Sequence, residues 1–298
     1  MDLLRTPEDR FSRLADFPYE PHYAELADGV RMAWVEAGPA DGPVVLLLHG
    51  EPSWSYLYRS MLPVLAEAGM RAVAPDLVGF GRSDKPARRE DHSYAAHVEW
   101  VRALAFDVLD LRDVTLVGQD WGGLIGLRLV AEHPDRFARV VAANTGLPTG
   151  DHDMPEVWHR FRRAVQGAAD LDVGRLVASG CARGLDPVAR AAYDAPFPDE
   201  SFKAGPRAMP GLVPYVPDDP ASEDNRRAWA TLTGSDLPVL VAFSDSDPIT
   251  AAMGPVLRRA LPGAHGREHP TITGAGHFLQ EDAGPELAAA VVELVATA

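Results

Sequence analysis

Short apolar runs alternate with segments of helical periodicity along most of the chain, and this alternation is the feature that most limits its fold. The runs have strand length and are rich in valine, leucine and alanine; they cover residues 44–48, 71–75, 114–118, 140–143 and 238–243. Continuous apolar strands separated by helices are typical of a parallel sheet that is covered on both faces. We therefore expect an α/β protein with a mostly parallel central sheet and helices on both of its faces.

Almost a hundred residues separate the last two of these runs, and that stretch shows little strand periodicity. It is rich in proline, arginine and tryptophan, with helix-like pieces near residues 156–166 and 187–193. A loop of such length without structure of its own would be unusual in a compact domain. We therefore predict an inserted helical cap at 148–232, which divides the α/β core into a first part, 1–147, and a second part, 233–298.

Charge and cysteine content limit the partners and the setting of the protein. The chain has 28 basic and 43 acidic residues, a net charge of −15, which disfavours nucleic acid and anionic membrane surfaces as partners. The single cysteine, Cys181, cannot form an internal disulfide, and the first residues lack the apolar core of a secretory signal. No run approaches the ~20 apolar residues that cross a bilayer. We expect a cytoplasmic protein.

The segment Gly118-Gln119-Asp120-Trp121-Gly122 lies between a predicted strand and a predicted helix. Small residues on both sides of a central side chain are typical of the sharp strand-to-helix turn called a nucleophile elbow, here with aspartate in place of serine. The amino terminus of the helix favours an ionised carboxylate. Asp120 is therefore a candidate nucleophile; the alternative is that it simply caps the helix.

A histidine and a carboxylate that could serve such a nucleophile follow it in the chain. His277 lies in the glycine-flanked segment Gly274-Ala275-Gly276-His277-Phe278, between a predicted strand near 269–273 and the final helix, and is the best candidate for a general base. Asp245 and Asp247 both follow the strand that resumes after the cap. We favour Asp247, which precedes Pro-Ile, as the partner of the histidine, and expect Asp245 to cap the loop.

The segment His49-Gly50-Glu51-Pro52 ends the first strong strand. Its backbone can present an N–H group toward the nucleophile, together with the N–H of Trp121, so we predict an oxyanion hole made by the backbones of Glu51 and Trp121. Such a hole is needed if water attacks an ester formed on Asp120. The alternative is an ordinary proline-containing turn.

Several segments, spread over nearly the whole length, resemble the haloalkane dehalogenases, enzymes of the α/β-hydrolase fold. They are HGEPSWSYLYR from His49, APDLVGFGRSDKP from Ala74, QDWGG from Gln119, AYDAPFPDESFKAG from Ala192 and AGHFLQED from Ala275. The resemblance implies a nucleophile at Asp120, a base at His277, its partner at Asp247, and an indole at Trp121 that donates to halide.

The resemblance also indicates a subgroup. Members that carry the acid after the earlier strand need Asp or Glu near position 144, where this chain has Asn144. Asp247 and Glu51 instead resemble the subgroup that binds halide with two tryptophans. For the second tryptophan, Trp158 fits the family position better than Trp229, although relatives whose tryptophan lies later in the cap would align it near Cys181. The alternative is that Trp158 only packs inside the cap.

The resemblance implies hydrolysis of the carbon–halogen bond of a halogenated alkane to a primary alcohol, halide and a proton, with water as the second substrate and no metal or organic cofactor. We expect a monomer or a small homo-oligomer. Two other functions stay open. An epoxide hydrolase shares the aspartate and histidine but needs cap tyrosines, for which Tyr193 and Tyr215 are candidates; a non-catalytic ligand-binding protein could keep the same fold.

Overall fold

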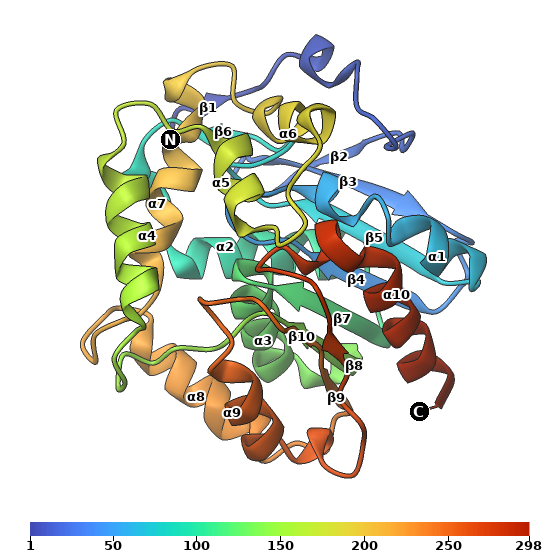
Figure 1. Ribbon diagram of the computed structural model, residues 1–298. Coiled ribbons are helices and arrows are strands. Elements are labelled where there is room, and N and C mark those ends of the chain that lie inside the picture. Colours follow the sequence, from blue (N-terminus) through green and yellow to red (C-terminus); the bar gives the residue numbers. More distant parts are fainter. Residues whose placement is uncertain (298) are drawn as a thin grey trace.

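A computed structural model describes residues 1–297, and a seven-stranded sheet forms its centre (Figure 1). The strands run in the order β2-β3-β5-β4-β7-β8-β9. Only the β2–β3 and β3–β5 pairs are antiparallel, and the neighbours from β5 to β9 are parallel. The expected mostly parallel sheet is therefore confirmed. The strands are β1 Leu3–Leu4, β2 His22–Glu25, β3 Arg31–Ala37, β4 Val44–Leu48, β5 Arg71–Asp76, β6 Lys85–Pro86, β7 Val114–Gln119, β8 Phe137–Ala143, β9 Val239–Val241, β10 Phe243–Ser244 and β11 Thr271–Ile272.

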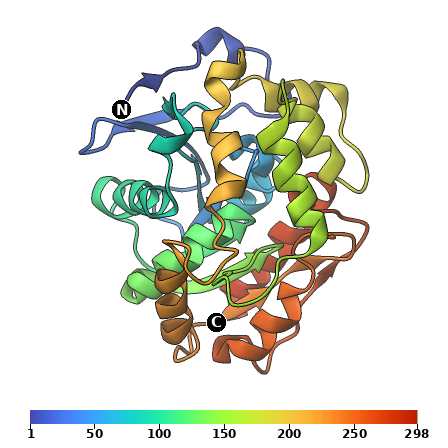
Figure 2. The same cartoon turned by 90° about the vertical axis from the view of Figure 1, so that its left-hand side faces the viewer.

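Helices cover both faces of this sheet, as expected. α2, α3 and α8 lie on one side, with α3 packed on β4 and β7, whereas α1 and α10 lie on the other (Figures 1 and 2). Strands β4 and β7 are buried almost throughout, which explains their continuous apolar sequences. The helices are α1 Leu62–Glu67, α2 Tyr94–Arg102, α3 Trp121–Glu132, α4 Glu156–Gly167, α5 Val173–Gly180, α6 Pro187–Asp194, α7 Ala204–Leu212, α8 Ser222–Leu232, α9 Met253–Ala260 and α10 Leu279–Thr297.

The stretch between β8 and β9 contains helices joined by loops, and no strand among the described residues. α4 packs on α7 and α5 packs on α6, above the carboxyl ends of the strands, whereas α8 packs on α3 of the core. We keep as a proposal the division into a core of 1–147 and 233–298 and a cap of 148–232. Because α8 belongs to the predicted cap and packs on α3, one helix of the cap also contacts the core.

Some elements differ from the expected ones. The antiparallel strands β2 and β3 were not predicted, although Asp28-Gly29 between them is a turn signal and Gly29 has a φ of +83°. The last helix begins at Leu279 and bends at Ala283. Within residues 1–297, no helix is both long enough and apolar enough to cross a bilayer.

Candidate active site

Asp120 stands at the junction of β7 and α3 with a backbone conformation that few residues adopt. Its φ is +50° and its ψ is −125°, a strained geometry for a residue with a side chain. The tight turn depends on Gly122, where an added Cβ would lie 1.9 Å from the carbonyl oxygen of Leu48. The Asp120 side chain accepts no hydrogen bond from the first turn of α3, so it does not serve as the side-chain cap of that helix.

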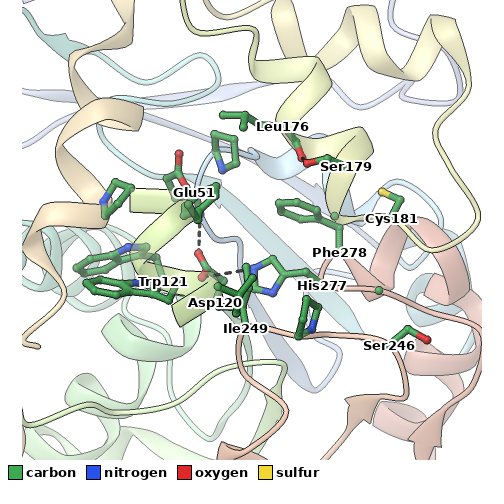
Figure 3. A pocket seen from close by; sticks show the side chains of 18 of the residues that line it. Glu51, Asp120, Trp121, Leu176, Ser179, Cys181, Ser246, Ile249, His277 and Phe278 are labelled. Atoms are coloured by element: carbon green, nitrogen blue, oxygen red, sulfur yellow. Dashed lines mark hydrogen bonds and ion pairs between the residues drawn. The ribbon is translucent and has the colours of Figure 1, made fainter. Parts of the chain in front are cut away.

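The Asp120 carboxylate faces one donor on each of its two oxygens. The backbone N–H of Glu51 donates to Oδ1 at 2.8 Å, and Nε2 of His277 lies 3.5 Å from Oδ2 (Figure 3). The Trp121 N–H, at the first position of α3, makes no hydrogen bond within residues 1–297. The structure therefore brings together the candidate nucleophile, the histidine and both predicted backbone donors, with one donor already engaged and one available.

Asp247 lies directly behind the histidine. Its Oδ2 is 3.2 Å from Nδ1 of His277, and the carboxylate also accepts hydrogen bonds from the N–H groups of Ile249, at 2.9 Å, and Thr250, at 3.2 Å. Asp245 points elsewhere and accepts from the N–H groups of the 274–275 turn. Of the two predicted candidates, Asp247 is the one in contact with the imidazole.

Buried charges set the protonation of this pair. Burial alone lowers the pKa of His277, but the carboxylates of Asp247 and Asp120 outweigh it and raise this pKa to about 10. Burial alone raises the pKa of Asp247, yet His277, the Thr250 hydroxyl and the Ile249 N–H together hold it below its ordinary value. The two carboxyl groups therefore favour the protonated form of the imidazole.

Two amides that the sequence analysis did not assign to the site hold the histidine loop. Asn144 donates from Nδ2 to the carbonyls of Gly276, at 2.9 Å, and His277, at 3.1 Å, and its Oδ1 accepts from the Ser244 N–H. Gln119 donates to the same His277 carbonyl at 3.1 Å. Both residues are fully buried. Their positions at strand ends, close to Asp120, were the signal available in the sequence.

A cavity of about 410 Å³ opens above Asp120 between the core and the helices of the predicted cap (Figure 3). Its walls are mainly apolar, and their titratable members are Glu51, Asp120, Cys181 and His277. A second cavity of about 680 Å³, between α8, α9 and residues 147–155, shares Asp120, Trp121 and Trp158 with the first. Asp120 therefore lies where two mainly apolar cavities meet.

The hydrogen bonding of the indole N–H groups sets two tryptophans of these cavity walls apart from the other four. Within residues 1–297, four of the six indoles donate to protein oxygens; they are those of Trp34, Trp54, Trp100 and Trp229. The indole N–H groups of Trp121 and Trp158 make no such bond, and both residues are buried in the cavity wall. Trp229 instead donates to the carbonyl of Leu147 at 2.7 Å.

The cap tyrosines lie outside both cavity walls. The hydroxyl of Tyr193 donates to Glu281, and Tyr215 packs against Trp158 with its ring centre 5.5 Å away. The feature that favoured an epoxide hydrolase is therefore missing from the site. Cys181 lines the first cavity, and within residues 1–297 no cluster of three or more histidine, cysteine or acidic side chains could hold a metal ion.

Comparisons with known proteins agree with this geometry at the level of the fold. The α/β-hydrolase fold family model matches residues 43–284. A solved haloalkane dehalogenase from Paraglaciecola agarilytica NO2, described as tetrameric, superposes with a TM-score of 0.92 and 36% identity, covering 100% of this chain and 99% of its own. The fold and the elbow thus define an α/β hydrolase.

Sequence relatives narrow the class. A haloalkane dehalogenase of Psychrobacter cryohalolentis is 51% identical over 99% of this chain and 98% of its own, and one of Mycobacterium marinum is 50% identical over 98% and 99%. The chain belongs to the haloalkane dehalogenase family. It is a hydrolase that acts on carbon–halide bonds, as the resemblance implied.

Proposed function

We propose that Asp120 attacks the halogen-bearing carbon of a haloalkane and forms an alkyl ester, with the halide as the leaving group. In-line displacement at saturated carbon needs an anionic nucleophile, and a carboxylate at the amino terminus of α3 supplies one without prior deprotonation. The Glu51 N–H holds Oδ1 at 2.8 Å and so orients the other oxygen. The apolar cavity suits an alkyl chain.

The indole N–H groups of Trp121 and Trp158 bind the departing halide in this proposal. One observation carries it: of the six tryptophans, these two have no protein acceptor within residues 1–297, and both line the cavity above Asp120. An indole N–H donates one hydrogen bond and accepts none, which suits an anion in an apolar space. A buried donor without a partner costs free energy, so its retention points to a ligand.

Water then hydrolyses the ester with His277 as the base. Esterification removes the charge of Asp120, and with it one of the two carboxylates that keep the imidazole protonated. The imidazolium therefore releases its proton once the ester forms, and the neutral ring takes a proton from water while Asp247 stabilises the cation that results. The N–H groups of Glu51 and Trp121 stabilise the tetrahedral oxyanion. Alcohol, halide and one proton leave.

A trapping experiment tests this sequence of steps. His277→Gln should still be alkylated by 1-bromobutane but should not hydrolyse the ester, so the protein should gain the mass of one butyl group, located on Asp120 by peptide mapping. His152→Gln, in the wall of the second cavity, is the matched control and should turn over without an adduct. Sustained bromide release by His277→Gln, or an adduct at another residue, contradicts the mechanism.

Assembly and setting are further proposals. The solved relative from Paraglaciecola is described as tetrameric, and we propose a monomer or a small homo-oligomer for this chain, with water and halide as the other small partners. The cytoplasmic setting is supported by the single unpaired Cys181. Sedimentation of the purified protein would measure the assembly state.

A further inference from the structure

The Glu51 carboxyl group is a buried polar group of the cavity wall that the proposed mechanism leaves without a role. Its backbone N–H is used by Asp120, but its side chain, in a residue that is 4% exposed, makes no hydrogen bond within residues 1–297. Oxygen Oε1 is fully buried and unpartnered. In Figure 3 the side chain extends away from Asp120 into the cavity.

The surroundings of this carboxyl group favour its protonated form. Burial raises its pKa well above the usual range, and the charge of Asp120 acts in the same direction, whereas His277 acts against both. An ionised Glu51 would place a second negative charge beside the nucleophile, with no hydrogen bond to stabilise it. A protonated Glu51 avoids that repulsion and carries an O–H donor.

The donor has no protein acceptor within residues 1–297, so its acceptor must enter the cavity. The indoles of Trp121 and Trp158 line the same cavity, and their N–H groups also make no hydrogen bond to the protein within residues 1–297. Three unpaired donors around one apolar space match an anion better than a neutral alkyl chain. The anion that the reaction generates there is the halide.

We propose that the Glu51 carboxyl group donates a hydrogen bond to the halide, as a third donor beside the indoles of Trp121 and Trp158. This inference rests on the proposed function, in which halide leaves within this cavity. The proton stays on Glu51 throughout, and no bond of this residue is made or broken. Glu51 thus acts twice on the reaction, through its N–H on Asp120 and through its carboxyl group on the leaving group.

Bromide binding to the resting protein, measured by calorimetry near pH 7, tests the proposal. Glu51→Gln keeps a neutral side chain with a donor and should bind bromide nearly as well as the unaltered protein. Glu51→Met keeps the length of the side chain but removes the donor, and should bind about ten- to a hundredfold more weakly. Ser179→Ala is the matched control, because Ser179 lines the same cavity while its hydroxyl donates to the Leu176 carbonyl.

The pH dependence gives a second readout that needs no destabilising substitution. As pH rises, ionisation of Glu51 should weaken bromide binding by the unaltered protein. Deprotonation of His277 also weakens bromide binding, but it does so in the unaltered protein and in Glu51→Gln alike. The difference between the pH profiles of these two proteins therefore reports the ionisation of Glu51. Asp120 is present in both proteins and cancels in the same way.

The outcomes separate this inference from the mechanism. If Glu51→Met, shown to be folded by thermal unfolding, binds bromide as tightly as the unaltered protein, or if Glu51→Gln is as weak as Glu51→Met, the inference is wrong even when His277→Gln is labelled on Asp120. If the bromide data follow the expected pattern but Asp120 is not labelled, the covalent mechanism is wrong and the anion site stands.

Discussion

Replacement of Trp158 by phenylalanine is the sharpest test of the halide site. The change keeps the aromatic packing against Tyr215 but removes the indole N–H, which has no protein acceptor within residues 1–297. A hydrogen bond to a charged group contributes about 1.5–3 kcal/mol. Since ~1.4 kcal/mol corresponds to a tenfold change in affinity, Trp158→Phe should bind bromide about ten- to a hundredfold more weakly. Trp121→Phe should show a loss of the same size.

Isothermal titration with bromide measures both losses directly, provided that thermal unfolding shows each variant to be folded. Trp229→Phe is the matched control, because Trp229 lines the second cavity but donates its N–H to the Leu147 carbonyl. Its bromide affinity should change by less than about twofold, or ~0.4 kcal/mol. The reasoning is refuted if Trp158→Phe binds bromide like the unaltered protein while Trp121→Phe is weakened, because Trp158 would then only pack within the cap.

Three further predictions concern the charged residues and their support. In single-turnover experiments, Asp247→Asn should slow ester hydrolysis far more than alkylation. Asp245→Asn, which loses contacts to the 274–275 turn, should change the rate of either step little. If Asp245→Asn slows hydrolysis more than Asp247→Asn does, Asp245 is the residue that orients the histidine. Asp120→Asn resembles the uncharged ester, so the pKa of His277, measured by NMR, should fall from its high value to near or below neutral pH, and a pKa that stays well above neutral pH would contradict the proposed release of the proton. Asn144→Ala removes the acceptor of the Ser244 N–H and one of the two donors to each of the Gly276 and His277 carbonyls, and should lower the free energy of unfolding in urea by about 1–3 kcal/mol, with a slower hydrolysis step if the histidine loop shifts.

Local sequence signals were sufficient to predict those parts of the protein whose conformation depends on neighbouring residues. The elbow around Asp120 needs small neighbouring residues because the chain turns beside the Leu48 carbonyl. This requirement is visible in the sequence as the glycine at position 122. The buried parallel strands are visible because both of their faces are covered, so every position is apolar. The edge strand β2 lacks this pattern, and its neighbour β3 is fully buried only over its four central residues, so both were missed.

Contacts between segments that are distant in the sequence could be identified only from the tertiary structure. Asp245 and Asp247 are the same residue type two positions apart, and only the path of their loop decides that Asp247 reaches His277, thirty residues later in the chain. Whether an indole N–H is free depends on acceptors far away in sequence, such as Leu147 for Trp229.

Glu51 shows the same division between sequence and structure. Its position after His49-Gly50 predicted a backbone donor, because the end of a strand orients its own N–H groups locally. The state of its side chain depends on burial beneath the cap and on the distance to Asp120 and His277, which are properties of the assembled fold. The sequence by itself therefore determined which chemical groups are present and at which turns they stand, and the tertiary structure decided which of them meet, because desolvation and hydrogen bonding act through space.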